Sequence, residues 1–200
     1  MNLVKLGVAP QLGKIILDNL SQHLGREVRV LVALMENAGS IFCRYGTEEE
    51  KSKSDCLKLR FCHPNGDLFT FLSVYKEWED KHKFVRNNWY WENSINAKSM
   101  VRCKDAIQEM EVYLKHELGI RVLTCWSWSP FGSSTCGVAL RKFILSCMDE
   151  NLAMFSRYER LGYNVAATEQ QAYLHPSCSF LDLGHNPKWV VFGELLCTTR

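Results

Sequence analysis

The chain has 200 residues, of which 46% are hydrophobic and 23% are charged, and this composition excludes wholesale disorder. Its 24 basic and 22 acidic residues leave a formal net charge of +2, which excludes a polybasic tail. Any contact with nucleic acid must therefore come from local placement of charge and not from the bulk field.

The N-terminal residues lack the pattern of a signal peptide, because Lys5, Gly7, Pro10 and Gly13 interrupt their apolar run. No segment approaches the ~20 apolar residues that a membrane span requires. The nine cysteines are odd in number and scattered singly along the chain. A secreted disulfide framework favours an even count in a shorter chain, so we expect free thiols and an intracellular protein without a membrane partner.

Helical patterns dominate the first half of the chain. Residues 10–24 predict an amphipathic helix, and residues 27–38 predict a second, apolar one. Thr47 followed by Glu50 is a capping box ahead of a polar helix. Asp67 is expected to cap a fourth helix, whose apolar residues line one side.

The longest helix is expected to begin near Trp89 and to end at Gly119. Apolar residues recur in it every three or four positions and predict a core-facing stripe, formed by Met100, Cys103, Ile107, Met110, Leu114 and Leu118. Four charged residues lie off this stripe and are expected to face outward: Lys98, Arg102, Lys104 and Glu109.

The pattern changes after this helix. Residues 123–137 have the Ser, Gly and Pro content of a linker loop, and residues 138–155 predict a further helix. Short segments rich in Val, Tyr, Phe and Trp then predict strands at Tyr163–Ala167, Gln171–His175 and Lys188–Thr198. We therefore expect an α+β protein with a helical domain at 1–122, a linker at 123–137, and a helix plus a small β module at 138–200.

Motifs with a known chemical mechanism are absent from the sequence. It has no GxxxxGK[ST] phosphate loop, no GxGxxG, no HExxH, no GxSxG and no CxxC pair. We expect the cysteines to be small apolar core residues. The residues themselves thus indicate neither a catalytic centre nor a metal site.

Two long stretches nevertheless resemble one family. FCHPNGDLFTFLSVYKEWE (61–79) and WYWENSINAKSMVRCKDAIQEM (89–110) resemble the helicase-associated, ratchet-like region of DEAH-box ATP-dependent RNA helicases. QQAYLHPSCSFLDLGHNPKWVVFGELLCTTR (170–200) is similar to the first half of that family's C-terminal OB fold. The opening LGVAPQLGKIILDN also fits the family's junction out of its winged-helix domain.

The likeness is greatest to a plant subgroup that carries appended RING-type modules, which this sequence lacks. It implies a helical, ratchet-like bundle followed by a partial, truncated OB fold. Both motor domains are also missing, so we expect no cofactor here; ATP and Mg²⁺ would bind those domains in a parent helicase. The chain alone should be inactive as an enzyme, and a parent would lie in the nucleus, the cytoplasm or the chloroplast.

The same resemblance implies that the chain binds and guides single-stranded RNA. The residues that it marks for this role are Asn93, Lys98, Arg102, His175, Ser177, Thr199 and Arg200. We expect the first three near the exposed side of the long helix. Where the family has Cys, Phe and Arg, this sequence has Tyr90, Ser94 and Lys98; lysine keeps the charge but loses the planar fork that grips phosphate.

Each of these assignments has a structural alternative. The basic residues would equally suit a solvated helix face, and the His-Pro-Ser run would equally suit a turn. Three tryptophans are either core residues or platforms for bases: Trp78, Trp89 and Trp91. For the whole chain, the alternatives to RNA binding are a module that docks a helicase-activating partner protein, or a truncated gene product without function.

Overall fold

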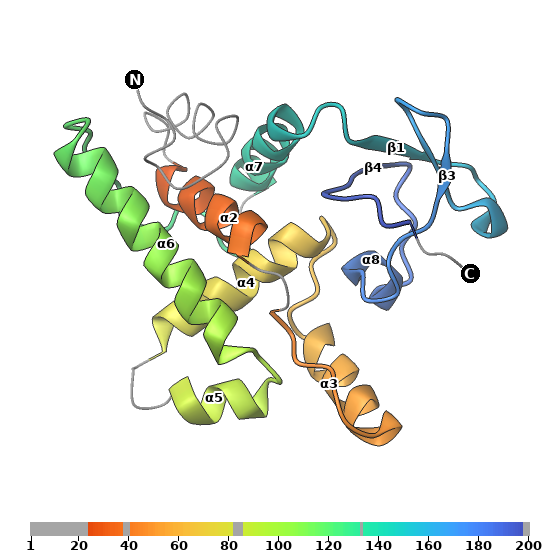
Figure 1. Ribbon diagram of the computed structural model, residues 1–200, viewed down its shortest axis with the longest axis horizontal. Helices are drawn as coiled ribbons and strands as arrows, with labels where there is room; N and C mark the ends of the chain where they lie inside the picture. Colours follow the sequence, from red (N-terminus) through yellow and green to blue (C-terminus); the bar gives the residue numbers. More distant parts are fainter. Residues whose placement is uncertain (1–23, 38–40, 82–85, 133, 198–200) are drawn as a thin grey trace.

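The computed structural model describes residues 24–37, 41–81, 86–132 and 134–197. Within these residues, helices form the first part of the chain and a small antiparallel sheet forms the last part, which confirms the α+β class (Figure 1). The helix predicted at 10–24 lies outside the described residues, except for its last residue. The helices of the first part are α2 (Gly25–Asn37), α3 (Glu48–Leu59), α4 (Asp67–Asp80), α5 (Arg86–Glu92), α6 (Ala97–His116) and α7 (Ser134–Cys147).

Helix α2 lies at the centre of the helical part. Every residue from Val28 to Leu34 is at most 2% exposed, and the helix packs against α4, α6 and α7. A helix that is buried on every side needs such a covering, and each buried Val or Leu side chain contributes about 1.5–3 kcal/mol. The core of the helical part is therefore built around this one segment.

Helix α3 confirms its sequence signature. The Thr47 side chain accepts a hydrogen bond from the backbone N–H of Glu50 at 3.3 Å, and the Glu50 carboxylate accepts one from the backbone N–H of Thr47 at 2.8 Å. The two bonds together satisfy donors that the start of a helix leaves open. Both groups are local in sequence, which is why the pattern alone predicted this start.

The single long helix predicted from Trp89 to Gly119 is wrong, because the chain forms two helices there. Helix α5 ends at Glu92, Ser94 has a φ of 51°, and Asn96 caps the start of α6. Ile95 pairs with Phe42 in an isolated β-bridge. This pairing comes from a distant segment, so helical periodicity could not predict it.

The helix predicted at 138–155 is also partly wrong. Helix α7 begins earlier, at Ser134 inside the predicted linker, and ends at Cys147. Residues Leu152–Phe155 instead form the strand β1. This short apolar run fits either structure locally, and pairing with strands on both sides decides for the extended form.

The sheet has the strand order β3–β2–β1–β4, and all its pairs are antiparallel. A small cluster of side chains packs beneath it, formed by Ala153, Tyr163, Val165 and Val190. The remaining elements are β2 (Tyr163–Val165), β3 (Gln171–Ala172), the short helix α8 (Ser179–Asp182) and β4 (Trp189–Val191), with a 3₁₀ turn at Glu159–Leu161. The predicted strands are confirmed in place but are shorter than expected.

Side chains of α7 belong to the helical core. Leu140 and Phe143 lie in the same buried cluster as the residues of α2, α4 and α6. The division of the chain into domains at 123–137 stays a prediction. No helix within the described ranges combines the length and the apolar character needed to cross a bilayer.

Candidate nucleic-acid interface

Helix α6 presents two of the predicted cations to solvent. The Asn96 side chain accepts hydrogen bonds from the backbone N–H groups of Lys98 at 3.1 Å and Ser99 at 3.4 Å, which starts the helix. Five members of the predicted stripe are each at most 1% exposed, namely Met100, Cys103, Ile107, Met110 and Leu114, whereas Leu118 lies beyond the end of α6 and is partly buried. Because that stripe faces α2, the side chains of Lys98 and Arg102 are exposed on the other side.

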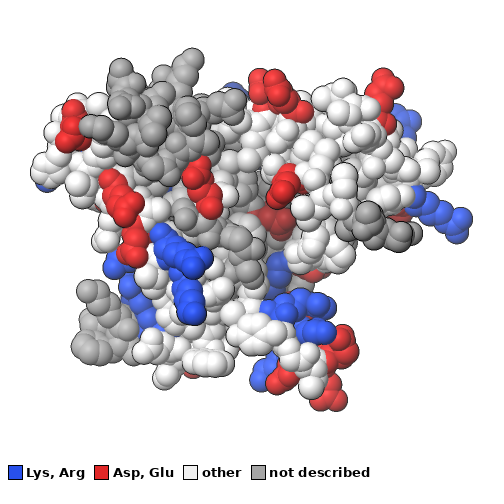
Figure 2. All heavy atoms as spheres, in the orientation of Figure 1, with Lys and Arg blue, Asp and Glu red and all other residues white. Residues whose placement is uncertain are grey.

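Charge is unevenly distributed along α6. Three cations lie in its N-terminal half, namely Lys98, Arg102 and Lys104, and Asp105, Glu109 and Glu111 follow them before Lys115 and His116 in the last turn. Figure 2 shows Lys and Arg side chains gathered over the lower half of this helix, with acidic side chains above them. A cation in the first turn, such as Lys98, meets the positive end of the helix dipole, so helix stability does not explain its place. Both the dipole and the cations favour an anion at this end.

Asn93 does not lie on the exposed side of a helix, contrary to expectation. It is 2% exposed and lies in the turn between α5 and α6. Its Oδ1 accepts a hydrogen bond from Arg60 Nη1 at 2.7 Å, and its Nδ2 donates to the Trp89 carbonyl at 2.8 Å. Both ends of the amide are thus engaged within the protein, and the residue fixes the turn that leads into α6.

The three tryptophans of this region differ in environment. Trp78 and Trp89 are core residues, 2% and 4% exposed. Their indole N–H groups donate to the Tyr90 hydroxyl at 2.6 Å and to Glu77 Oε1 at 3.0 Å. Trp91 is 83% exposed. Of the three tryptophans, Trp91 is therefore the one whose ring is exposed and could stack on a base.

Lys104 is half-buried and not fully outward-facing as expected. It lines a recess of about 110 Å³ between α2, α4 and α6. Arg26 in this recess pairs with Glu79 and, at 2.6 Å, with Glu111. Nearby Arg29 is fully buried, and this burial lowers the pKa of its guanidinium, although Glu111 opposes the shift. The sequence had not indicated this ion-pair cluster, whose cations bind neighbouring carboxylates.

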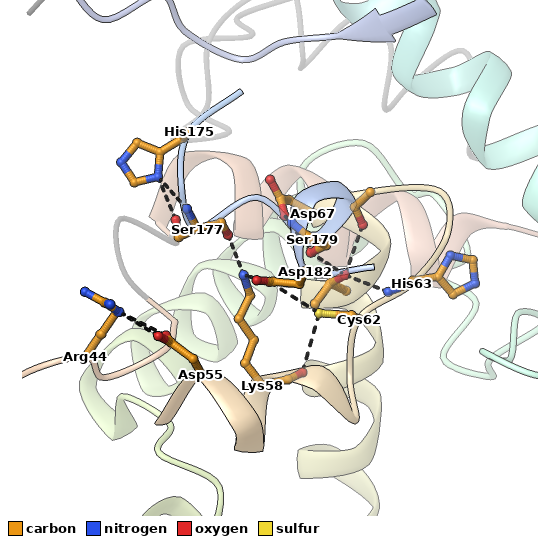
Figure 3. Close-up of polar contacts among 12 residues, drawn as sticks. Arg44, Asp55, Lys58, Cys62, His63, Asp67, His175, Ser177, Ser179 and Asp182 are labelled. Carbon is orange, nitrogen blue, oxygen red and sulfur yellow. Dashed lines mark hydrogen bonds and ion pairs between the residues drawn. The ribbon is translucent and has the colours of Figure 1, made fainter. Parts of the chain in front are cut away.

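His175 and Ser177 form a turn beside α3. His175 Nδ1 lies 2.7 Å from Ser177 Oγ and accepts a hydrogen bond from the Ser177 backbone N–H at 3.2 Å. Figure 3 shows the two side chains facing each other above Lys58, whose ammonium donates to the Ser177 carbonyl. The structure therefore supports the turn for these residues, and their role toward RNA stays a prediction.

The same segment is anchored to the helical part by buried polar contacts. Asp67 Oδ1 accepts hydrogen bonds from the backbone N–H of Ser179 at 2.7 Å and from its hydroxyl at 2.6 Å. Asp67 was expected to cap α4, and this is wrong, because Gly66 is the N-cap and carries no side-chain bond. Burial also raises the pKa of the adjacent Cys178 thiol to about 12 and so keeps it protonated.

The predicted site residues form two separate groups. Lys98 and Arg102 lie on α6, whereas His175 and Ser177 lie against α3, and no contact joins the two groups among the described residues. Thr199 and Arg200 lie outside the described residues. Nor do the described residues include a group of three His, Cys, Asp or Glu side chains placed to hold a metal ion.

Comparisons with known proteins give a consistent result. No protein-family model matches the chain. Over 194 residues it is 52% identical to the Arabidopsis thaliana protein "ATP-dependent RNA helicase DEAH11, chloroplastic", and it is equally similar to "ATP-dependent RNA helicase DEAH12, chloroplastic" of the same plant. The matches cover 97% of this chain but only 11% of each relative. The resemblance inferred from the two sequence stretches is confirmed.

Proposed function

We propose, from the homology of this chain to a segment of DEAH-box ATP-dependent RNA helicases, that it is an accessory part of such a helicase that binds single-stranded RNA. The exposed pair Lys98 and Arg102 at the basic half of α6 carries the proposal. Cations there attract phosphates without regard to base sequence. In a parent enzyme the motor domains would supply ATP hydrolysis, and this segment would hold and guide the strand.

Lys98 and Arg102 are suited to this role because both side chains are exposed and neither forms an ion pair with another described residue. Both project from the helix opposite the buried stripe, so they approach a strand without unpacking the core. The cations of Arg26 and Arg60, in contrast, are held by carboxylates at 2.6 and 2.7 Å. A phosphate contact therefore costs little at Lys98 and Arg102, and would break an ion pair at the other two.

The direct test is RNA binding by the whole chain across a salt series. Fluorescence anisotropy would measure the Kd for a single-stranded RNA with wild type and with Lys98→Ala/Arg102→Ala. Each lost phosphate contact lowers the slope of log K against log salt by about 0.7, so the double variant should lose about 1.4. Arg141→Ala/Lys142→Ala is the matched control, since it removes two exposed cations from α7.

The control double variant should bind RNA as the wild type does, within about twofold on the reasoning that screened, distant charges contribute little. Equal losses of RNA affinity in both double variants would mean that binding depends only on the net charge of the protein and not on the position of these two cations. Salt-insensitive binding, or none at low salt, would refute the RNA role. We expect no ATP hydrolysis by this chain in any of these samples.

A second candidate function is the docking of a helicase-activating partner protein. The observation that favours it lies on the outer face of the sheet, where Met154 and Trp189 are cross-strand partners and are 39% and 51% exposed. A pull-down from nuclease-treated extract with wild type and Trp189→Ser tests it. A partner that is retained without RNA and lost in the variant would favour docking.

A truncated product without function is distinguished by its unfolding. An open sheet with unpaired edge strands invites aggregation. A cooperative thermal transition in monodisperse protein argues against this alternative.

The relatives are described as chloroplastic, and we propose that compartment for a parent helicase.

A further inference from the structure

Trp91 lies close in the chain to the basic half of α6, from which one short turn separates it. It lies in the last turn of α5, and its carbonyl accepts a hydrogen bond from the Ser94 backbone N–H at 3.3 Å. The left-handed φ of 51° at Ser94 then reverses the chain, and the buried amide of Asn93 holds the turn to Arg60. These hydrogen bonds hold the backbone of the short turn that separates Trp91 from Lys98.

The exposure of Trp91 is not explained by folding. Its side chain is 83% exposed, whereas the tryptophan two positions earlier is 4% exposed and fully engaged in the core. A buried aromatic side chain of this size would contribute about 1.5–3 kcal/mol or more to stability. The chain does not use Trp91 in this way, so an external partner is the natural use of its ring.

The surroundings of Trp91 favour a nucleobase over a protein. Within α5, the exposed neighbours of Trp91 are polar: Asn87, Asn88 and Glu92. A protein interface has an apolar core in which several side chains are buried together. Base stacking, in contrast, requires a single aromatic face next to groups that hold the phosphates. Lys98 and Arg102 supply such groups on the adjoining helix.

We infer that Trp91 stacks on a base of single-stranded RNA whose phosphates are held by the basic half of α6. This inference rests on the proposed function and adds to it a contact with the bases. Because any base offers a π-face, the contact would be tolerant of sequence but stronger for purines, whose faces are larger. It would place a base at one defined point of the strand, at the turn between α5 and α6.

The experiment compares two oligomers of equal length and charge, one a run of adenylates and the other carrying abasic sites at its central positions. The Kd of the full chain for each is measured at low salt for wild type, Trp91→Ala, Trp91→Phe and Phe131→Ala. Phe131 is 98% exposed and precedes α7, so its replacement is the matched control for removing an exposed aromatic ring. Unfolding midpoints confirm that each variant is folded.

Wild type should prefer the adenylate oligomer, and Trp91→Ala should lose about 5- to 150-fold in affinity for it, which is the range of base–aromatic stacking. The abasic oligomer should bind wild type and Trp91→Ala equally. Trp91→Phe should restore part of the loss, and Phe131→Ala should change nothing. In wild type, adenylate binding should quench tryptophan emission, and Trp91→Phe should lose that quenching.

Equal losses on both oligomers, or no loss on either, would overturn the stacking contact. In that case the proposed RNA binding would still stand, without the stacking contact, if wild type bound RNA and Lys98→Ala/Arg102→Ala reduced the salt slope of that binding. If wild type bound neither oligomer, both the proposed RNA binding and the stacking contact would be refuted. Self-association of the chain that Trp91→Ala abolishes, measured by sedimentation, would assign the ring to protein contact and overturn the inference.

Discussion

Lys58 of α3 and Asp182 of α8 form an ion pair in which 2.6 Å separate Nζ and Oδ2, although 124 positions lie between them in the chain. The ammonium also donates to the Ser177 carbonyl. Lys58 is 6% exposed, so its charge has been withdrawn from water and needs both partners to offset the desolvation. This pair ties the segment that leads to β4 onto the helical part (Figure 3).

Replacing Lys58 with methionine should destabilise the chain. The variant keeps the apolar stem but leaves the Asp182 carboxylate and the Ser177 carbonyl without this donor. We expect the free energy of unfolding to fall by about 1–3 kcal/mol, measured by urea denaturation. Lys51→Met is the control, because Lys51 pairs with an 85% exposed Glu48 on the same helix and such pairs contribute about 0–1 kcal/mol. Equal effects of the two substitutions would contradict the buried role of Lys58.

Gly66→Ala should be more damaging than an alanine at another left-handed glycine. Gly66 has a φ of 96°, and a Cβ there would lie 2.8 Å from the ring of Phe180. Gly119 has a φ of 64° and nothing within 4 Å of such a Cβ. Backbone strain of about 1–3 kcal/mol adds to this contact at Gly66, because its φ of 96° and ψ of −169° lie in a region that is essentially restricted to glycine. We therefore expect Gly66→Ala to exceed Gly119→Ala in its loss of unfolding free energy, and equal losses would exclude the close approach of Phe180.

Asn93→Ala should affect stability and not the number of phosphate contacts with RNA. The substitution removes the hydrogen bonds to Arg60 and to the Trp89 carbonyl from a residue that is 2% exposed. We expect a loss of about 1–3 kcal/mol in unfolding free energy. Below its unfolding temperature, the variant should keep the wild-type salt dependence of RNA binding in anisotropy. A slope reduced by about 0.7 would instead identify Asn93 as contributing to a phosphate contact.

His63 should make stability depend on pH. Burial lowers the pKa of its imidazole below the ordinary 6.5, the charge of Arg141 acts in the same direction, and a hydrogen bond to the Pro130 backbone opposes them. Its neutral Nδ1 also accepts a hydrogen bond from the Asn65 backbone N–H at 3.1 Å. Because the unfolded chain binds this proton more readily, the full stability is present above pH 6.5 and declines as the pH falls toward the lower folded pKa.

His63→Phe tests this dependence, since phenylalanine retains a ring against Phe69, whose centroid lies 5.1 Å from that of His63. Urea denaturation between about pH 7.5 and pH 5 should show a smaller decline for the variant than for wild type. An imidazole titration by NMR should place the folded pKa of His63 below 6.5. Identical slopes for the two proteins would show that His63 does not contribute to the decline.

Local patterns predicted much of the helical part. The capping box of Thr47 and Glu50 involves atoms three positions apart, so its geometry follows from the sequence alone. The buried stripe of α6 was likewise predicted, because helical spacing places its members on one face. The break at Ser94 and the strand β1 were not predicted, since both depend on pairing with distant segments.

The candidate interface also contains features that the sequence predicted and features that it could not predict. Exposure of Lys98 and Arg102 follows from their place opposite an apolar stripe, and it was predicted. For the tryptophans, composition and spacing could not decide: Trp89 and Trp91 are two positions apart, and only the packing of α4 against α5 buries the first and leaves the second in solvent.

The amino-acid sequence by itself determined the relationship to helicases, the order of helices before strands and the outward cations of α6, because each of these depends on residues that are close together in the chain. Only the tertiary structure decided that Asn93 faces inward and that Lys58 and Asp67 hold the segment around Ser179. A buried polar group is satisfied by whichever partner folding brings within hydrogen-bond distance, and for these residues that partner lies 33 to 124 positions away.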